Sequence, residues 1–498
     1  MHAARIPTVE AEAVSVLSLR PVAATLGILL SILGAAMLLP AVVDFSTRSG
    51  GQGAFVGASA ITVFVGVLLW MSGRGQSMRK LDLRQAFLLT TSVWVVLSLF
   101  AALPLMWSHS QLSFTAAMFE SMSGLTTTGA SVMSGLDAMS PGVLLWRALL
   151  HWFGGIGIIG IAIAVLPVLS IGGMQLFRTE SSDKSDKFLP RAGTIAKRLL
   201  TAYVLLTAGC AGCYLMAGLE PFDAVTIAMS TLSSGGFANS DSSLTVFAKP
   251  AVDYVAIVFM LAAALPFPLY VRALAGDPWR LFSNPEVRLF LTIVGVFTLL
   301  SFLQLTLSGI AAGETALRWA LFTVASLIST TGFMAADYTN WGASSDAIFF
   351  VLMFLGGCTG STSGGMKAFR LAITAKAIRQ HLKRISFRAG VFPLRYGGAP
   401  VAEDVVTSVL SFVFLYLLAF FLIGVALNMM GLDLRTAFSA SISCLANVGP
   451  GLGPIVGPAS NFGGLPESAL WLLTAAMLLG RLEILTVLVL FLPRFWVR

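Results

Sequence analysis

The chain has 498 residues, of which 57% are hydrophobic and 11% are charged, whereas about a quarter of the residues of an average soluble protein are charged. This composition excludes an ordinary soluble protein and indicates a polytopic membrane protein. The formal net charge of +8 does not indicate a nucleic-acid partner, because the basic residues cluster in alternate loops between apolar stretches.

The first apolar stretches predict a hairpin of two membrane-spanning helices, near residues 20–44 and 54–73. A cleavable signal peptide is not expected, because residues 1–19 contain Glu10 and Glu12 and lack a compact apolar core with a small-residue cleavage site. We expect residues 1–75 to form a cytoplasmic N-terminus and an extra transmembrane hairpin.

Three basic segments set the expected orientation in the membrane, at residues 74–84, 178–198 and 367–395. By the positive-inside rule these loops face the cytoplasm, and both chain termini then lie on that side. The outer side instead collects ten of the 23 acidic residues, of which Asp137 is the first and Glu467 the last. An acidic outer mouth would concentrate cations, although ordinary solvated loop charge accounts equally well for any single residue.

A glycine motif occurs four times, each time after an apolar stretch, at Gly129, Gly236, Gly332 and Gly449. In every copy an alanine stands twelve residues before the glycine, a serine stands six before it, and a small polar side chain stands two before it. The copies lie roughly a hundred residues apart, which is far longer than a solenoid repeat and leaves room for more than one span per unit. We therefore predict four tandem copies of one membrane motif.

Each unit reads as an outward apolar helix, a short amphipathic segment, the glycine motif and an apolar helix back. The outward helices are expected near residues 85–107, 199–219, 286–311 and 405–430. The short segments, such as residues 222–232, are too brief to cross a bilayer and fit re-entrant helices. Non-helical backbone at that depth must face protein or water, so the glycine segments are expected to converge on a polar axis. The predicted fold is all-α, with the N-terminal hairpin and pore repeats at residues 76–170, 171–275, 276–395 and 396–498.

Such an axis suits a potassium ion, because backbone carbonyls from four segments can replace its hydration shell without adding charge. Glycine reaches the backbone conformations that this requires, and the C-terminal end of a short helix favours a cation. The copies are unequal (TTTGA, SSGGF, STTGF and ANVGP). We expect weaker discrimination of potassium from rubidium and sodium than four identical loops would give.

The returning helices contain irregularities. The third is interrupted by LGGCTGSTSGGMK at residues 355–367, which favours a movable break beneath the pore, with a small-residue packing seam as the alternative. The fourth, over residues 468–493, contains Arg481 and Glu483, and charge in an apolar run must face a partner or water. No catalytic residues, enzyme activity or organic cofactor are expected, because the histidines form no cluster and no nucleophile has a base partner.

Taken together, these motifs resemble the TrkH and KtrB superfamily of potassium uptake proteins, and the TrkH branch most closely. The resemblance spans nearly the whole chain. It is carried by TTTGAS at 126, RALLHWFGGIGIIGIAIAVLP at 147, GGMQLFRTES at 172, SSGGF at 233, STTGF at 329, GGCTGSTSGGMK at 356, NVGPG at 447 and GRLEILTVLVLF at 480. It implies potassium uptake through one pore, a homodimer in the bacterial inner membrane, and a cytosolic nucleotide-binding regulator of the TrkA type.

The resemblance also implies roles for individual residues. The implied potassium selectivity filter comprises Thr127, Thr128, Gly129, Ser234, Gly235, Gly236, Thr330, Thr331, Gly332, Asn447, Val448 and Gly449. The implied gate comprises an intramembrane loop with Gly356, Gly357, Gly360, Gly364, Gly365 and Lys367, together with the pore arginine Arg481. A structural pair between Arg481 and a carboxylate such as Glu483 is the alternative role for the arginine.

The mode of transport is open at the level of the sequence. Both passive flow and coupling to protons or sodium are compatible with these motifs. The basic stretch from Arg370 to Arg395 fits either a regulator docking surface or an ordinary positive-inside loop. The rival function is a cation-coupled solute symporter, which requires a midplane substrate pocket in unwound helices.

Overall fold

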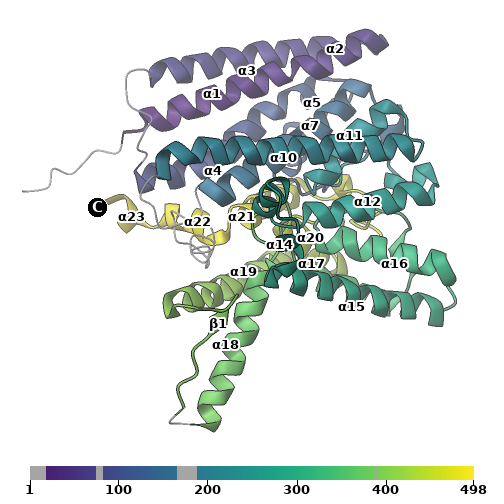
Figure 1. The fold of residues 1–498 in the computed structure, drawn as a ribbon. Helices are drawn as coiled ribbons and strands as arrows, with labels where there is room; N and C mark the ends of the chain where they lie inside the picture. Colours follow the sequence, from purple (N-terminus) through teal and green to yellow (C-terminus); the bar gives the residue numbers. More distant parts are fainter. Residues whose placement is uncertain (1–17, 74–81, 165–187, 388–389, 498) are drawn as a thin grey trace, which may run out of the picture.

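The computed structural model describes residues 18–73, 82–164, 188–387 and 390–497. Most of the basic segments at residues 74–84 and 178–198, and the GGMQLFRTES motif at residues 172–181, lie outside the described residues. The regular secondary structure of the described chain is almost entirely helical, as the sequence predicts, and its longest helices lie side by side (Figure 1).

The N-terminal hairpin forms one edge of the helix bundle (Figure 1). It consists of α1 (Arg20–Ala36), α2 (Leu38–Thr47) and α3 (Gln52–Ser72). Helix α1 packs along α3, and α2 also packs on α7 of the following unit. Both predicted spans are present, the first with a short interruption at Met37.

Four long outward helices occur close to their predicted positions. They are α4 (Leu83–Ala101, continued by α5, Leu103–Trp107), α10 (Phe188–Met216), α15 (Pro285–Leu307) and α19 (Glu403–Met429). The interruption between α4 and α5 lies just before Pro104, which lacks an N–H for the helical hydrogen-bond pattern.

A short helix follows each outward helix and packs against it. The short helices are α6 (Phe114–Leu125), α11 (Pro221–Leu232), α16 (Gly313–Ile328) and α20 (Leu434–Ala446). Their C-terminal halves are largely buried; in α6, every residue from Ala117 to Leu125 is buried. These helices are therefore surrounded by protein, as expected for re-entrant segments.

The chain then returns through a second set of helices. Each is preceded by a 3-10 turn, and the turns are η1 (Leu136–Ala138), η2 (Ser243–Phe247), η3 (Tyr338–Asn340) and η4 (Phe462–Gly464). The returning helices are α7 (Pro141–Ala164), α12 with α13 (Pro250–Ala263 and Phe267–Leu274), α17 with α18 (Ala343–Phe354 and Ala368–Ser386), and α21 with α22 (Glu467–Arg481 and Ile484–Leu488). Only the first of the four is continuous.

The sequence predicts one helix over residues 468–493, and this prediction is wrong. Helix α21 ends at Arg481, and the chain bends by 109° before the apolar stretch continues through α22. Glu483 has φ +59, a left-handed conformation that a continuing helix does not allow. Its carboxylate pairs with Arg370 at 2.7 Å, so a tertiary ion pair holds the bend. A second bend, of 97°, separates α12 from α13.

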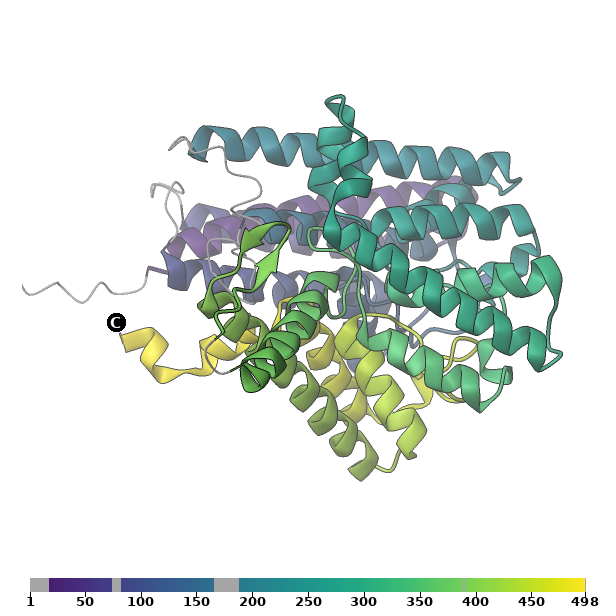
Figure 2. The ribbon, with the colours of Figure 1, turned by 60° about the horizontal axis from the view of Figure 1, so that its bottom comes forward.

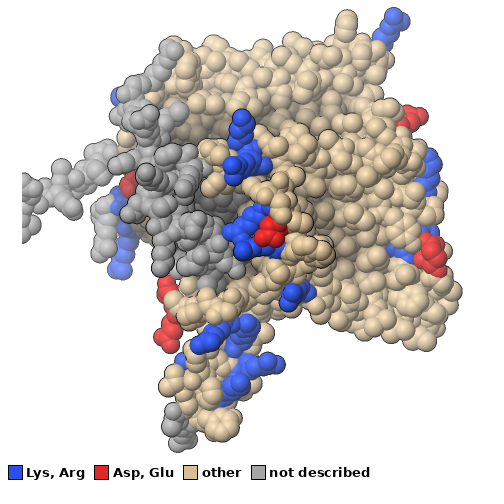
Figure 3. All heavy atoms as spheres, viewed as in Figure 1, with Lys and Arg blue, Asp and Glu red and all other residues tan. Residues whose placement is uncertain are grey.

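The remaining elements lie away from the centre of the bundle. They are α14 (Trp279–Ser283), the strands β1 (Arg395–Tyr396) and β2 (Ala399–Pro400), η5 (Val489–Phe491) and α23 (Pro493–Val497). The two strands pair antiparallel, with Arg395 opposite Pro400. Helix α18 extends away from the bundle, and Lys and Arg side chains gather on it (Figures 1 and 3).

The helices have the length and apolarity of membrane spans. Seven of the described helices can cross a bilayer, or up to nine spans form if each bent pair counts as one. Helix α17 is a shorter apolar helix that ends at the break in the third returning segment. In Figure 3 most of the right-hand half of the bundle surface is uncharged, and charged side chains gather at its right-hand end, near the middle of the view and around α18. The protein is therefore a multi-pass membrane protein.

Candidate ion-conduction site

The four short helices end in the same way. The residue two before each repeated glycine has a left-handed backbone, with φ of +51, +55, +57 and +57 at Thr127, Ser234, Thr330 and Asn447. The next N–H donates back to the carbonyl of the repeated serine; the bonds are Thr128 to Ser123 at 2.9 Å, Gly235 to Ser230 at 2.9 Å, Thr331 to Ser326 at 2.9 Å and Val448 to Ser443 at 2.8 Å. This is a Schellman-type helix end. The backbone carbonyl of the repeated serine thus accepts the hydrogen bond that ends each short helix.

The glycines that follow also have positive φ. The values are +82 at Gly129, +82 at Gly236, +81 at Gly332 and +103 at Gly449. Glycine adopts this conformation without the steric cost that a Cβ imposes. Two left-handed positions separated by one residue turn the backbone of each loop sharply. The carbonyl groups of the loop therefore no longer point along the helix axis.

The four loops form a closed ring. A Cβ placed on each glycine would meet the carbonyl oxygen of the residue just before the glycine in the next copy. The pairs are Gly129 with Gly235, Gly236 with Thr331, Gly332 with Val448, and Gly449 with Thr128. The order runs from the first copy to the fourth and back to the first. Segments up to about three hundred residues apart are therefore packed backbone against backbone.

A side-chain bond joins the fourth copy to the first. The Nδ2 amide of Asn447 donates to Thr128 Oγ1 at 2.9 Å and to the Met477 carbonyl at 2.9 Å. All of the filter residues that the sequence predicts lie in these four loops, and the twelve positions are buried except for Gly129, Gly236 and Gly332, which are partly exposed. The loops are thus held by protein on their outer faces.

A cavity of about 220 Å³ lies against the ring, and all four glycines line it. Its wall also includes residues that follow the glycines, among them Ser131 and Ala238. Of the acidic residues expected on the outer side, Asp241 lines this cavity, and the basic residue Arg147 lines it as well. The cavity is the wider approach to the ring.

The interruption at residues 355–367 passes directly under the other side of the ring. Thr362 and Ser234 share a hydrogen bond between their hydroxyl oxygens at 2.9 Å. The N–H of Gly364 donates to Thr330 Oγ1 at 2.6 Å. The segment therefore contacts the left-handed residues of the second and third loops. We call residues 355–367 the intramembrane loop.

Two cationic side chains hold the intramembrane loop. Arg481 Nη2 donates to the Thr362 carbonyl at 2.6 Å, and Lys367 Nζ donates to the Ser363 carbonyl. Both side chains line a small cavity of about 50 Å³, together with Gly360, Gly364 and Gly365. The predicted gating residues are thus brought together, apart from Gly356 and Gly357, which pack inside the loop against residues 363–365.

Arg481 does not form the alternative pair with Glu483. The Glu483 carboxylate is 2.7 Å from Arg370 Nη2, and the Arg370 guanidinium also lies over the Phe412 ring at 3.8 Å. Residues two apart on a helix do not face each other, and the bend turns Glu483 further away. Arg481 instead meets the intramembrane loop.

Sequence reasoning missed Glu286, a buried carboxylate at the start of α15. Its Oε1 accepts from Thr359 N at 2.8 Å, Thr359 Oγ1 at 3.0 Å and Phe369 N at 3.2 Å. One oxygen therefore joins the intramembrane loop to the first turn of α18. Glu286 could have been found in the sequence as a carboxylate at the edge of an apolar run. The rule that a charged residue in an apolar run is costly and usually functional identified Arg481 in the same way.

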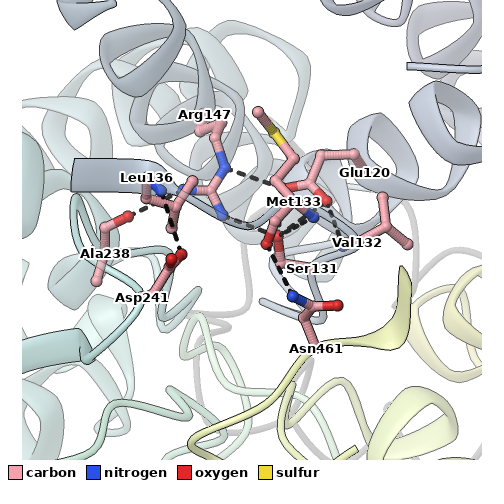
Figure 4. A network of polar contacts seen from close by, with 9 residues as sticks. All are labelled: Glu120, Ser131, Val132, Met133, Leu136, Arg147, Ala238, Asp241 and Asn461. Atoms are coloured by element: carbon pink, nitrogen blue, oxygen red, sulfur yellow. Dashed lines mark hydrogen bonds and ion pairs between the residues drawn. The ribbon is translucent and has the colours of Figure 1, made fainter. Parts of the chain in front are cut away.

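Three more buried polar residues lie beside the first two loops and were not identified as site residues. Glu120 and Arg147 form an ion pair near the outer cavity (Figure 4). His151 packs on the Phe237 ring with centroids 4.1 Å apart, and it occupies the space that a Cβ on Gly235 would need. This contact accounts for Gly235, the glycine that precedes the repeated Gly236 in SSGGF.

The chemistry of the ring is that of backbone oxygen. Across the described ranges, no group of three or more His, Cys, Asp or Glu residues is placed to hold a metal ion. Hard monovalent cations are matched by rings of carbonyl oxygens. The geometry therefore suits the passage of a cation rather than its tight capture.

Comparisons with known proteins agree with this geometry. The family model TrkH, described as cation transport protein, matches residues 51–497. The Trk system potassium uptake protein TrkI of Halomonas elongata is 46% identical over 416 residues, which cover 83% of this chain and 84% of the relative. The Trk system potassium uptake protein TrkH of Vibrio parahaemolyticus is 37% identical over 484 residues, covering 96% and 99%.

A solved structure matches over almost the same length. The crystal structure of the potassium transporter TrkH from Vibrio parahaemolyticus superposes with a TM-score of 0.89 at 36% sequence identity, covering 96% of this chain and 100% of that chain. Identity at this level over the whole length, with the same fold, shows common descent rather than a shared architecture alone. This chain therefore belongs to the TrkH family of cation transport proteins.

Proposed function

We propose that this chain is the ion-conducting subunit of a Trk-type potassium uptake system. The observation that carries the proposal is the closed ring of four loops, in which each glycine packs on a carbonyl of the next copy. The names of the relatives add the substrate, because they are potassium uptake proteins. A transport family is not an enzyme class, and potassium is its cargo.

Selection of potassium follows from the backbone of the ring. A potassium ion leaves its water shell when four loops offer carbonyl oxygens in its place. The filter comprises Thr127, Thr128, Gly129, Ser234, Gly235, Gly236, Thr330, Thr331, Gly332, Asn447, Val448 and Gly449. The C-terminal ends of α6, α11, α16 and α20 all point toward it and add partial negative charge. Because the four loops differ, discrimination against sodium is weaker than in a ring of identical loops.

Gating belongs to the intramembrane loop and Arg481. The intramembrane loop closes the ion path below the filter. Its gating residues are Gly356, Gly357, Gly360, Gly364, Gly365 and Lys367. The charges of Arg481 and Lys367 oppose the passage of a cation at this point. Contacts of Arg481 with Thr362 and of the loop with Ser234 and Thr330 support this role.

The assembly and orientation form part of the proposal. The chain works as a homodimer in a bacterial inner membrane, with a cytosolic nucleotide-binding regulator of the TrkA type and no organic cofactor of its own. Both described chain ends lie at the same end of the bundle in Figures 1 and 2, which supports two cytoplasmic termini. The working units are the hairpin at residues 1–75 and pore repeats at 76–170, 171–275, 276–395 and 396–498. The rival function, a solute symporter, has no support among the relatives.

Uptake by living cells tests the proposal directly. The chain is expressed, together with its regulator, in cells that lack their own potassium uptake systems. We expect growth at low external potassium, and uptake of radioactive rubidium that potassium inhibits. Growth that stays dependent on high potassium, with no rubidium uptake by a chain present in the membrane, contradicts the proposal.

A further inference from the structure

A buried ion pair lies behind the first filter loop. Glu120, on α6, and Arg147, on α7, are 0% and 2% exposed, with Arg147 Nε 2.9 Å from Glu120 Oε1. Charges this deep in a membrane protein are costly and usually serve a function. Neither residue belongs to the filter or to the gate described above.

Arg147 joins the first and second filter loops. Its Nη2 donates to Ser131 Oγ at 3.2 Å, and its Nη1 donates to the Ala238 carbonyl at 2.9 Å. Ser131 and Ala238 occupy the same place in their copies, two residues after Gly129 and Gly236. The guanidinium also lies over the Phe237 ring, 4.0 Å from its centroid. Figure 4 shows Arg147 between Ala238 on one side and Glu120 on the other.

Glu120 fixes the backbone that leaves the first loop. Its carboxylate accepts from Ser131 Oγ at 3.0 and 3.1 Å and from Val132 N at 2.9 Å. The network continues to the fourth copy, because the Phe462 N–H donates to the Ser131 carbonyl at 2.8 Å. Asn461 Nδ2 also donates to the Met133 carbonyl at 3.3 Å (Figure 4). Three of the four outer segments thus meet around one ion pair.

The pair is particular to the first copy. The positions that match Glu120, nine residues before the glycine, are Ile227, Thr323 and Ala440 in the other copies. None of these side chains carries a charge. The four loops are therefore stabilised unequally, because the buried ion pair of Glu120 and Arg147 lies on the side of the first loop.

We propose that Arg147 and Glu120 are positioning residues that fix the outer ends of the first two filter loops and thereby set ion selectivity. The inference rests on the proposed function. The planar guanidinium makes three contacts in fixed directions, toward Glu120, Ser131 and Ala238, and a lysine ammonium does not reproduce that fork. A lysine keeps the charge opposite Glu120 but releases at least one of the two loops.

The variant Arg147→Lys distinguishes a role of Arg147 in positioning the loops from a role in balancing the charge of Glu120. Loss of one such hydrogen bond corresponds to about a three- to tenfold change in an equilibrium. We expect Arg147→Lys to reach the membrane in normal amounts, to raise the KM for potassium, and to lower the selectivity for potassium over sodium by that factor. The measurement is uptake of rubidium in competition with potassium and sodium, scaled to the protein present in the membrane.

Arg318→Lys is the matched control. Arg318, on α16, is 12% exposed, and its guanidinium pairs with the carboxylates of Asp253 and Glu314 rather than with a filter loop. The same substitution there is expected to leave the KM and the selectivity unchanged. A second test variant, Glu120→Gln with Arg147→Gln, removes both charges together and avoids an unpaired buried charge.

The outcomes separate this inference from the proposed function. Wild-type selectivity in both Arg147→Lys and the double variant overturns the inference and leaves potassium uptake intact. Absence of both variants from the membrane also overturns it, because the pair then serves folding alone. A wild-type chain that takes up no potassium or rubidium contradicts the proposed function itself. Lower selectivity in Arg147→Lys, with Arg318→Lys unchanged, supports the inference.

Discussion

Each of the four glycine loops contains two left-handed residues, and the two positions differ in whether they tolerate a side chain. At Thr127, Ser234 and Thr330 a side chain is present, with φ between +51 and +57. At the glycines the limit is steric as well as conformational, because the next copy's carbonyl occupies the place of a Cβ. A substitution at a glycine therefore acts on two loops at once.

Gly332→Ala is expected to weaken the filter. The methyl group meets the Val448 carbonyl and the Pro450 ring, and the left-handed backbone adds about 1–2 kcal/mol of strain. We expect potassium affinity to fall at least about tenfold, and sodium uptake to rise relative to potassium. Competition uptake measured at equal amounts of membrane protein tests this.

Gly342→Ala controls for backbone strain alone. Gly342 has φ +91, but nothing lies within 4 Å of an added Cβ. It is expected to lower stability without changing selectivity. An unchanged KM and selectivity in Gly332→Ala would remove this loop from the filter.

The sequence located the four glycine loops well because their spacing repeats. The fixed distance from serine to glycine reflects a helix end of constant length, and this geometry needs few residue types. The ion pair of Glu120 and Arg147 was missed because it occurs in one copy only. Comparison of the copies identifies the residues that all four share. It does not identify a stabilising ion pair that three of the copies lack.

At the scale of elements, the third and fourth returning segments meet at their breaks. The intramembrane loop separates α17 from α18, and Arg481 at the end of α21 donates to it. The loop is also held from the far side, where Glu286 at the start of α15 accepts from Thr359 and Phe369. Movement of the loop must break contacts at both places.

Glu286→Ala is expected to release the intramembrane loop. The substitution leaves the N–H groups of Thr359 and Phe369 and the Thr359 hydroxyl without their acceptor, at about 1–3 kcal/mol for each buried group. We expect higher ion flux and less dependence on the proposed regulator, measured as current in a reconstituted bilayer. Glu286→Gln is the matched control, because a single oxygen accepts all three bonds and an amide retains one oxygen. Equal flux in wild type, Glu286→Ala and Glu286→Gln would exclude this role for Glu286.

The break in the third returning segment could be predicted from the sequence, and the break in the fourth could not. Five glycines in residues 355–367 remove helix propensity locally, so composition alone predicts an interruption. Around Glu483 no comparable run of glycines marks a break. The bend there depends on Arg370, which lies more than a hundred residues earlier in the chain, and local patterns do not contain that information.

At the scale of the whole molecule, the N-terminal hairpin is attached to the pore units by a buried carboxylate. Asp44, at the end of α2, accepts from Gly142 N at 2.7 Å, Ser49 Oγ at 2.8 Å and Ser140 Oγ at 3.3 Å. It is 0% exposed. The hairpin contributes no residue to the ring or to the intramembrane loop.

Asp44→Ala is expected to lower stability without altering ion selection. Loss of hydrogen bonds to a charged acceptor costs roughly 1.5–3 kcal/mol, so Tm of the purified protein should fall. Competition uptake should give wild-type selectivity. Asp277→Ala is the control, since the Asp277 carboxylate is 54% exposed in a surface pair with Arg280. A change in selectivity with Asp44→Ala would show that the hairpin influences the filter.

The ring has a consequence for how such a protein changes over generations. Because all four quarters are encoded in one gene, a point mutation alters one side of the ion path and leaves the other three as they were. A tetramer of identical chains changes all four sides in the same mutational step. The single chain can therefore acquire intermediate ion preferences through successive small changes, each confined to one loop, and its second and fourth loops already differ from the first by serine, valine and proline residues.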